Sequence, residues 1–117
     1  MSTIDRLDAG NKIFSLGVRY NGVVTTAGIV ADDLNADARG QASQILKTID
    51  RVLAHFGTSK HKLLTASLWV TDIRLRAAVN EAWMEWVDQA ALPTRATVEA
   101  KLADPAMLVE IQVSAAV

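Results

Sequence analysis

The stretch Asn35–Phe56, NADARGQASQILKTIDRVLAHF, predicts the clearest amphipathic helix in the chain. Its apolar residues recur every three or four positions, so they would form one stripe along a helix. They are Ala38, Ala42, Ile45, Ile49, Val52, Leu53 and Phe56. Asp33 or Asn35 is placed to cap the start, and Gly57 is placed to end the helix. A helix with a single apolar stripe must pack that stripe against another layer.

The residues that follow predict a strand and a second helix. Alternation over Leu63–Thr71 is typical of a strand, and Asp72 then offers a helix cap. Pro93 marks the predicted end of this helix. Its apolar stripe consists of Leu75, Val79, Ala82, Trp83, Trp86, Val87 and Ala90. Two helices with one stripe each need a shared sheet face to cover.

The N-terminal part of the chain predicts a β-hairpin. Asn21-Gly22 favours a two-residue turn, because both central residues of such a turn take positive φ. The turn would join a strand near Ile13–Tyr20 to one near Val23–Ile29, with a shorter strand around Thr3–Leu7 before them.

Two further strands close the chain, Arg95–Leu102 and Leu108–Ala116, separated by Asp104-Pro105. The order β-β(-β)-α-β-α-β-β predicts one α+β domain over residues 1–117, in which a mixed sheet carries both helices on one face. The other face of that sheet would be bare.

The bare face is predicted to be apolar. We expect it to include Thr97 and Ser67, but also Trp69 and several valines. Such a surface is too apolar to stay exposed, so the sequence predicts that copies of the chain associate through it.

Composition excludes several classes of protein. The 117 residues contain no cysteine, so there are no disulfides, thiolate metal sites or cysteine nucleophiles. The net charge is −1 with no basic stripe, which argues against nucleic-acid binding. No export signal and no stretch of about 20 apolar residues is visible, so we expect a cytoplasmic protein with no membrane partner.

Most catalytic signatures are absent: there is no phosphate loop, GxGxxG, HExxH or GxSxG. His55 and His61 are six residues apart, which suits neither a helical metal pair nor a proton relay, so we interpret both as surface histidines. We interpret Asp32-Asp33 as part of a loop and helix start, and the three tryptophans as packing or interface residues.

Arg95 is the strongest candidate for a binding residue. It begins a strand on which Thr97, Glu99 and Lys101 share its face. A guanidinium near the polar face of a neighbouring strand can grip a carboxylate with two hydrogen bonds. An arginine in a salt bridge would produce the same pattern, so spacing alone leaves both interpretations open.

The same region resembles the C-terminal signature of the Rid (YjgF) family. That signature is a Pro-x-Arg-x-x-Val segment, a turn with Pro, and a Val-Glu-Ile strand. Upstream, Thr26-Ala27-Gly28 is similar to the family's Thr-Ser-Gly, and Asn80 matches an asparagine of the second helix. The Asn-x-Ala-Trp and Val-Glu-Ile patterns are closest to the YoaB-like branch. The matching residues are Leu92–Ala100, Leu102, Pro105, Leu108–Ile111, Thr26–Gly28 and Asn80.

The resemblance implies a two-layer chorismate-mutase-like fold and a homotrimer whose sheets close into a central barrel, with clefts between subunits. It also implies a 2-iminobutanoate or 2-iminopropanoate deaminase-like hydrolase, which converts 2-imino acids or enamines to 2-keto acids and ammonia. The substrate is a small carboxylate, and neither cofactor nor metal is used.

The resemblance also assigns site residues. Arg95 would bind the substrate carboxylate, and the backbone around Gly28 and Thr97 would complete the pocket. Phe14 aligns with a pocket tyrosine. Gln112 stands where active deaminases carry a glutamate; its amide can hold a water but cannot take its proton.

These departures leave an alternative open. Ala27 replaces a serine, Phe14 lacks a hydroxyl and Gln112 lacks an acid, while Glu110 is implied to be structural. The chain could therefore bind keto acids or amino acids without turnover. A third reading, endoribonuclease or translation inhibitor, is disfavoured by the charge balance.

Overall fold

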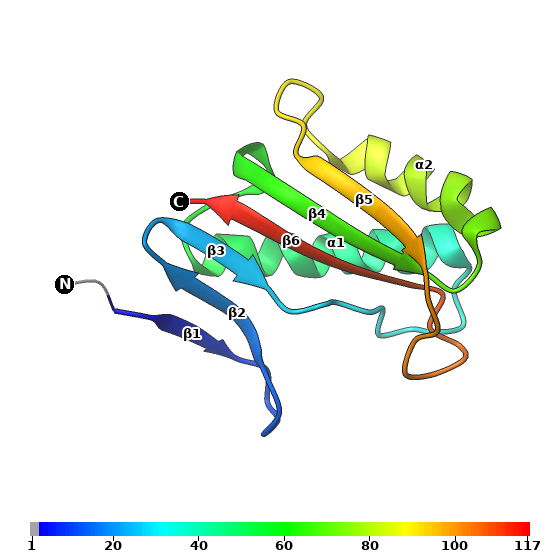
Figure 1. The fold of residues 1–117 in the computed structure, drawn as a ribbon, viewed down its shortest axis with the longest axis horizontal. Coiled ribbons are helices and arrows are strands. Elements are labelled where there is room, and N and C mark those ends of the chain that lie inside the picture. The colour runs from blue at the N-terminus through cyan, green and yellow to red at the C-terminus, as the bar shows by residue number, and fades with distance from the viewer. Residues whose placement is uncertain (1–2) are drawn as a thin grey trace.

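The computed structural model describes residues 3–117, which form a six-stranded sheet with two helices on one face (Figure 1). The strands are β1 (Asp5–Asp8), β2 (Ser15–Tyr20), β3 (Val23–Thr26), β4 (Leu63–Val70), β5 (Thr94–Glu99) and β6 (Val109–Ala116). The helices are α1 (Ala38–His55) and α2 (Arg76–Trp86), with short 3-10 turns η1 (Lys60–Lys62) and η2 (Ile73–Leu75) before β4 and α2. The predicted two-layer α+β class with a mixed sheet is confirmed.

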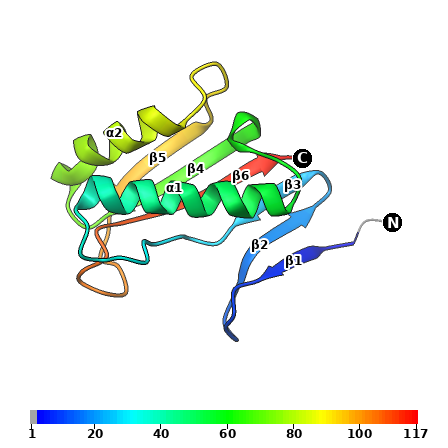
Figure 2. The same cartoon turned by 180° about the vertical axis from the view of Figure 1, so that it is seen from behind.

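The sheet order is β1-β2-β3-β6-β4-β5, so the last strand lies in the middle and β5 forms an edge. β4 and β5 run parallel, with α2 as the crossover between them, while the other neighbouring pairs are antiparallel. Seen from behind, both helices cover the same side of the sheet, with α2 at the β5 edge (Figure 2). Residues 3–117 contain no helix long and apolar enough to cross a membrane.

The hairpin and the core follow the predicted patterns. Asn21 and Gly22 join β2 to β3 with φ of 49° and 76°, as a two-residue turn requires. The apolar stripe of α1 is buried against β-strand residues such as Leu68 and Ile111. Gly17 lets α1 approach β2, because a Cβ there would lie 2.9 Å from side-chain atoms of Val52 and Phe56.

The start of α1 differs from the prediction. Asp37 is the cap, and its carboxylate accepts a hydrogen bond of 2.8 Å from the Gly40 N–H. This three-residue separation satisfies an otherwise unpaired N–H of the first turn. Asp33 instead accepts from the Asn35 N–H within the preceding loop. The prediction of Asp33 or Asn35 as the cap was wrong, because the helix begins later in the chain, after Asp37.

The second helix is shorter than predicted. Asp72 caps η2 rather than α2, since its side chain accepts from the Arg74 N–H. The helix ends at Trp86, well before Pro93, because Val87 takes an extended conformation and is buried. Asp88 then accepts from the Ala90 N–H, a local turn that competes with the helix.

The sheet face away from the helices is open in the described chain (Figure 1). Ser67 and Trp69 lie on it as predicted, because they alternate with the buried Ala66 and Leu68 of β4. Thr97 does not. It is the register partner of Leu68 and therefore faces the helices, so its predicted place on the bare face was wrong.

The open face carries exposed apolar side chains, as the sequence predicts. Tyr20 and Val23 from the β2–β3 hairpin are 46% and 38% exposed, and Val98 on β5 is 49% exposed. Side chains of this size on one sheet face favour burial against other protein surface.

Candidate functional site

Arg95 lies at the start of the edge strand β5 and is held from α2. Because its register partner on β4 is the buried Ala66, its side chain points to the helix-covered face. There its Nη2 donates a 2.7 Å hydrogen bond to Oδ1 of Asn80. The guanidinium carbon also lies over the Trp83 ring, 5.3 Å from the centroid, in a cation–π contact. Asn80 and Trp83 are three residues apart and so share one helix face.

The Arg95 guanidinium has no carboxylate within ion-pair distance in the part of the chain that the structure describes. Burial, helped by the positive charge of the nearby Arg76, lowers the pKa of Arg95 from its ordinary value. An arginine nevertheless stays protonated in proteins. A partly buried, uncompensated charge of this kind attracts an anion, so the salt-bridge interpretation left open by the sequence does not hold within residues 3–117.

Thr97 shares the helix-side face of β5 with Arg95, two residues further along. Its hydroxyl oxygen is buried and has no hydrogen-bond partner within residues 3–117. Buried polar atoms are nearly always paired, so this hydroxyl needs a water or ligand partner. We call Arg95, Thr97, Asn80 and Trp83 the guanidinium corner.

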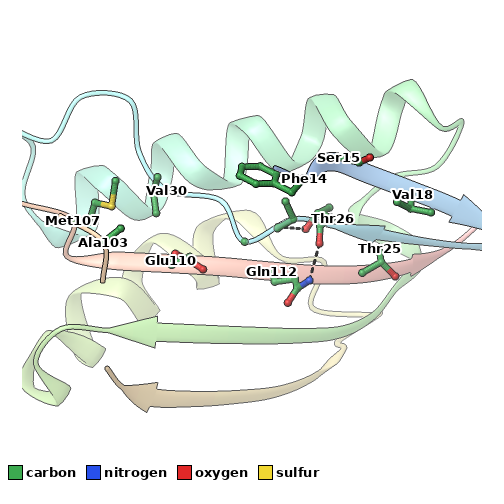
Figure 3. Close-up of a pocket in the computed structure, with 12 residues that line it drawn as sticks. Phe14, Ser15, Val18, Thr25, Thr26, Val30, Ala103, Met107, Glu110 and Gln112 are labelled. Atoms are coloured by element: carbon green, nitrogen blue, oxygen red, sulfur yellow. Dashed lines mark hydrogen bonds between the residues drawn. The ribbon is translucent and has the colours of Figure 1, made fainter. Parts of the chain in front are cut away.

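A second region lies on the open face of the sheet, in an open concavity of about 720 Å³ (Figure 3). Its lining includes Phe14, Gly28, Glu110 and Gln112. Phe14 is 53% exposed, so the concavity is open to solvent on that side. We call this region the open-face pocket.

Gln112 is fixed in one orientation in the open-face pocket. Its amide Nε2 donates a 2.8 Å hydrogen bond to the carbonyl oxygen of Thr26 (Figure 3). The amide oxygen accepts no hydrogen bond from residues 3–117 and so remains available to a water. This amide can position a water, but it cannot accept the water's proton.

Gly28 and Glu110 are in close contact within the same pocket. A Cβ at Gly28 would overlap the carboxylate of Glu110, so this position excludes any side chain unless Glu110 moves. The Gly28 N–H donates no hydrogen bond inside the described chain. Both groups could therefore contact a ligand.

Within one chain, the residues predicted from sequence fall into these two separate regions. Arg95 and Thr97 face the helices from the β5 edge, whereas Glu110 and Gln112 are register partners of Trp69 and Ser67 and face the open side. The sheet itself separates them. A site that contains both groups therefore requires two copies of the chain.

Sequence reasoning missed the partners of Arg95. Trp83 was interpreted as packing or interface, yet its ring lies under the guanidinium. Asn80 was noted only as a family match, yet it bonds Arg95 directly. Their three-residue spacing was the available signal, but nothing in the sequence indicated that this helix face meets β5.

The histidines lie outside both regions. His61 is exposed, and its Nδ1 lies 2.9 Å from Oδ2 of Asp88 in a surface pair. The residues described by the structure contain no cluster of three or more His, Cys, Asp or Glu side chains suited to a metal ion.

Comparisons with known proteins cover almost the whole chain. A family model described as endoribonuclease L-PSP matches residues 3–117. A RutC family protein of Haemophilus influenzae is 39% identical over 114 residues, 97% of each chain. The RutC family protein YoaB of Escherichia coli is 37% identical over 115 residues, 98% of this chain and 99% of that protein.

Among solved structures, a member of the YjgF protein family from Neisseria meningitidis superposes with a TM-score of 0.93 at 33% identity. The match covers 97% of this chain and 94% of that one.

Proposed function

This chain belongs to the YjgF (Rid) family, and from that premise we propose that it is a hydrolytic deaminase of reactive 2-imino acids or enamines. The products are 2-keto acids and ammonia. The observation that carries the proposal is the partly buried guanidinium of Arg95, which has no carboxylate partner in residues 3–117 and is held by Asn80 and Trp83.

The complete site is a cleft between two copies in a homotrimer. The guanidinium corner of one copy meets the open-face pocket of its neighbour, because no single chain brings the two regions together. Burial of the open face, with Tyr20, Val23 and Val98, supplies the apolar area that holds the copies together.

Arg95 binds the substrate carboxylate in the plane of the guanidinium. The guanidinium lies over the Trp83 ring, and Asn80 accepts a hydrogen bond from one of its five N–H groups. The remaining N–H groups can hold both carboxylate oxygens at once. This bidentate grip fixes the adjacent imine carbon relative to the rest of the site.

The reaction needs little activation because an iminium carbon is already electrophilic. Water adds to C2, and the π electrons of the C=N bond move to nitrogen, which gives a carbinolamine. A proton passes from the added oxygen to the nitrogen, the C–N bond breaks, and the oxygen lone pair forms the keto group. Ammonia leaves, so one imino acid and one water yield one keto acid and one ammonia.

Gln112 positions the attacking water through its available amide oxygen. Because an amide cannot accept the proton, the substrate nitrogen takes it in this mechanism. We therefore expect slower turnover than a site with a carboxylate at this position would give.

The test is to generate 2-iminopropanoate or 2-iminobutanoate with an amino-acid oxidase and to follow its decay. Wild type should accelerate decay, and Arg95→Ala should lower kcat/KM by about a hundredfold or more, since charge-assisted hydrogen bonds contribute about 1.5–3 kcal/mol each. Arg74→Ala is the matched control, because Arg74 is already paired with Asp72. Decay that is no faster with wild type than with Arg95→Ala would refute the deaminase.

A binding protein without turnover is the second candidate, and Gln112 favours it because no acid stands at its position. Calorimetry with 2-oxobutanoate, beside the imine-decay assay, distinguishes the deaminase from the binding protein. Arg95-dependent binding without imine hydrolysis would select the binding protein. No binding and no hydrolysis would exclude both.

A further inference from the structure

Arg76 places a second positive charge beside the guanidinium corner. It is the first residue of α2 and lies one turn before Asn80, so the two share a helix face. We propose that Arg76 binds a second carboxylate, which makes the preferred ligand of this site a dicarboxylic 2-imino or 2-keto acid. This inference rests on the proposed function and specifies the class of acid.

The pairing of the nearby charges supports this role. Arg74 is bound by Asp72, and Glu99 accepts the Ile73 N–H and acts on Arg74. Glu81 is paired with Arg39 on the outer face. Within the described chain, neither Arg76 nor Arg95 has such a partner.

Arg76 is close enough for its charge to contribute to the lowered pKa of Arg95. The repulsion between the two guanidinium groups is modest, because Arg76 is exposed to solvent, but no carboxylate of residues 3–117 pairs with either group. A dianion offsets this repulsion, whereas a monoanion compensates only one of the two charges.

The orphan hydroxyl of Thr97 is a second, independent indication of a ligand. It lies on the face of β5 that carries Arg95, and it is buried without a partner. A ligand oxygen or a ligand-bound water would satisfy it. Arginines and a hydroxyl together form a donor set typical of sites for carboxylate oxygens.

Two acids of equal chain length test the proposal by calorimetry on the assembled full chain. 2-Oxoglutarate carries a second carboxylate where 2-oxopentanoate carries a methyl group. We expect wild type to bind 2-oxoglutarate about tenfold to a hundredfold more tightly, which is the range for one hydrogen-bonded charge pair.

Arg76→Ala should remove that preference, while 2-oxopentanoate affinity falls less than about threefold because an exposed charge acts weakly at a distance. Arg74→Ala removes the same charge from the same segment and should keep the preference. Arg76→Lys should retain part of it, since a lysine keeps the charge but loses the planar fork.

The outcomes separate this inference from the proposed function. Arg95-dependent binding of 2-oxopentanoate with no preference for 2-oxoglutarate overturns the role of Arg76 alone. The role of Arg76 is also overturned if Arg76→Ala loses affinity equally for both acids. It is likewise overturned if the assembly dissociates in that variant. No Arg95-dependent binding of either acid overturns both proposals.

Discussion

The guanidinium corner and the open-face pocket differ in how much of their geometry one chain supplies. The corner is complete by itself: Asn80 and Trp83 hold Arg95 from a single helix face. The open-face pocket is exposed to solvent at Phe14 and carries a neutral amide at Gln112. In the proposed function, one chain therefore supplies the groups that recognise the acid, whereas the closed, water-excluding site depends on a second copy.

This contrast predicts that ligand affinity depends on the guanidinium corner and that turnover depends on the open-face pocket. A preorganised charge determines what binds, and a water-positioning amide influences how fast the bound molecule reacts. Changes at the corner should alter affinity, and changes at the open-face pocket should alter turnover.

Gln112→Glu should have the largest effect on turnover. The new carboxylate would face the Thr26 carbonyl oxygen that now accepts the amide N–H, which disfavours its charged form and raises its pKa towards neutrality. A general base of this kind should raise kcat about tenfold to a hundredfold and add an ascending limb to the pH–rate profile. Imine-decay kinetics as a function of pH measure both effects.

The control for that substitution is Gln89→Glu, which adds the same charge at an exposed position after α2. It should leave the pH–rate profile as in wild type. An unchanged kcat in Gln112→Glu would contradict the assignment of Gln112 to the attacking water.

Asn80→Asp tests whether ligand affinity depends on the guanidinium corner. It places a carboxylate where Oδ1 now accepts from Arg95 at 2.7 Å, so the new charge competes with the ligand. We expect about tenfold or greater loss of 2-keto acid affinity, and a smaller loss in Asn80→Ala, which removes only the positioning bond. If Asn80→Ala lowers the 2-keto acid affinity more than Asn80→Asp does, Asn80 does more than orient the guanidinium.

Gly28→Ala tests how tightly the open-face pocket is built. The added Cβ overlaps the carboxylate at the end of the flexible Glu110 side chain, which can shift aside, so we expect a loss of stability of about 1 kcal/mol or less. The thermal midpoint at fixed protein concentration should fall. Adding Glu110→Ala should recover part of the loss, and purely additive effects would show that the two groups do not meet.

Asp72→Asn should have the smallest effect and leaves both regions intact. Hydrogen bonding to Arg74 lowers the pKa of Asp72 to about 2. A carboxyl whose folded-state pKa is depressed stabilises the fold above its ordinary pKa, and this contribution is lost as the pH falls towards 2. Between pH 4 and pH 2, roughly, the thermal midpoint of wild type should therefore fall more steeply than that of Asp72→Asn.

Much of the fold was predictable from local patterns. The Asn21-Gly22 turn, the stripe of α1 and the alternation of β4 depend on short-range sterics and on one buried face. The errors occurred at helix ends and in the direction that Thr97 faces on β5. Asp33, Asn35 and Asp37 can each cap, and Val87 left α2 because the core buries it in an extended conformation.

Motifs in the sequence propose a set of site residues but not how these residues are arranged. Arg95, Gly28 and Gln112 were named from motifs, and their proposed roles remain to be tested. Their division between two faces of the sheet depends on strand order, which places β6 between β3 and β4 and puts β5 at the edge.

Which side chains share a face follows from the sequence alone, because alternation along a strand and the helical repeat are properties of the backbone. Which face of β5 meets α2 depends on long-range packing, and so does the position of Arg95 over Trp83 and beside Asn80. The physical reason is that β5 turns its polar face, with Arg95 and Thr97, to the helices and leaves Val98 on the open side, an outcome of long-range packing that alternation alone does not predict. That packing left Arg95 without a carboxylate partner in residues 3–117, and so made it available to bind an acid.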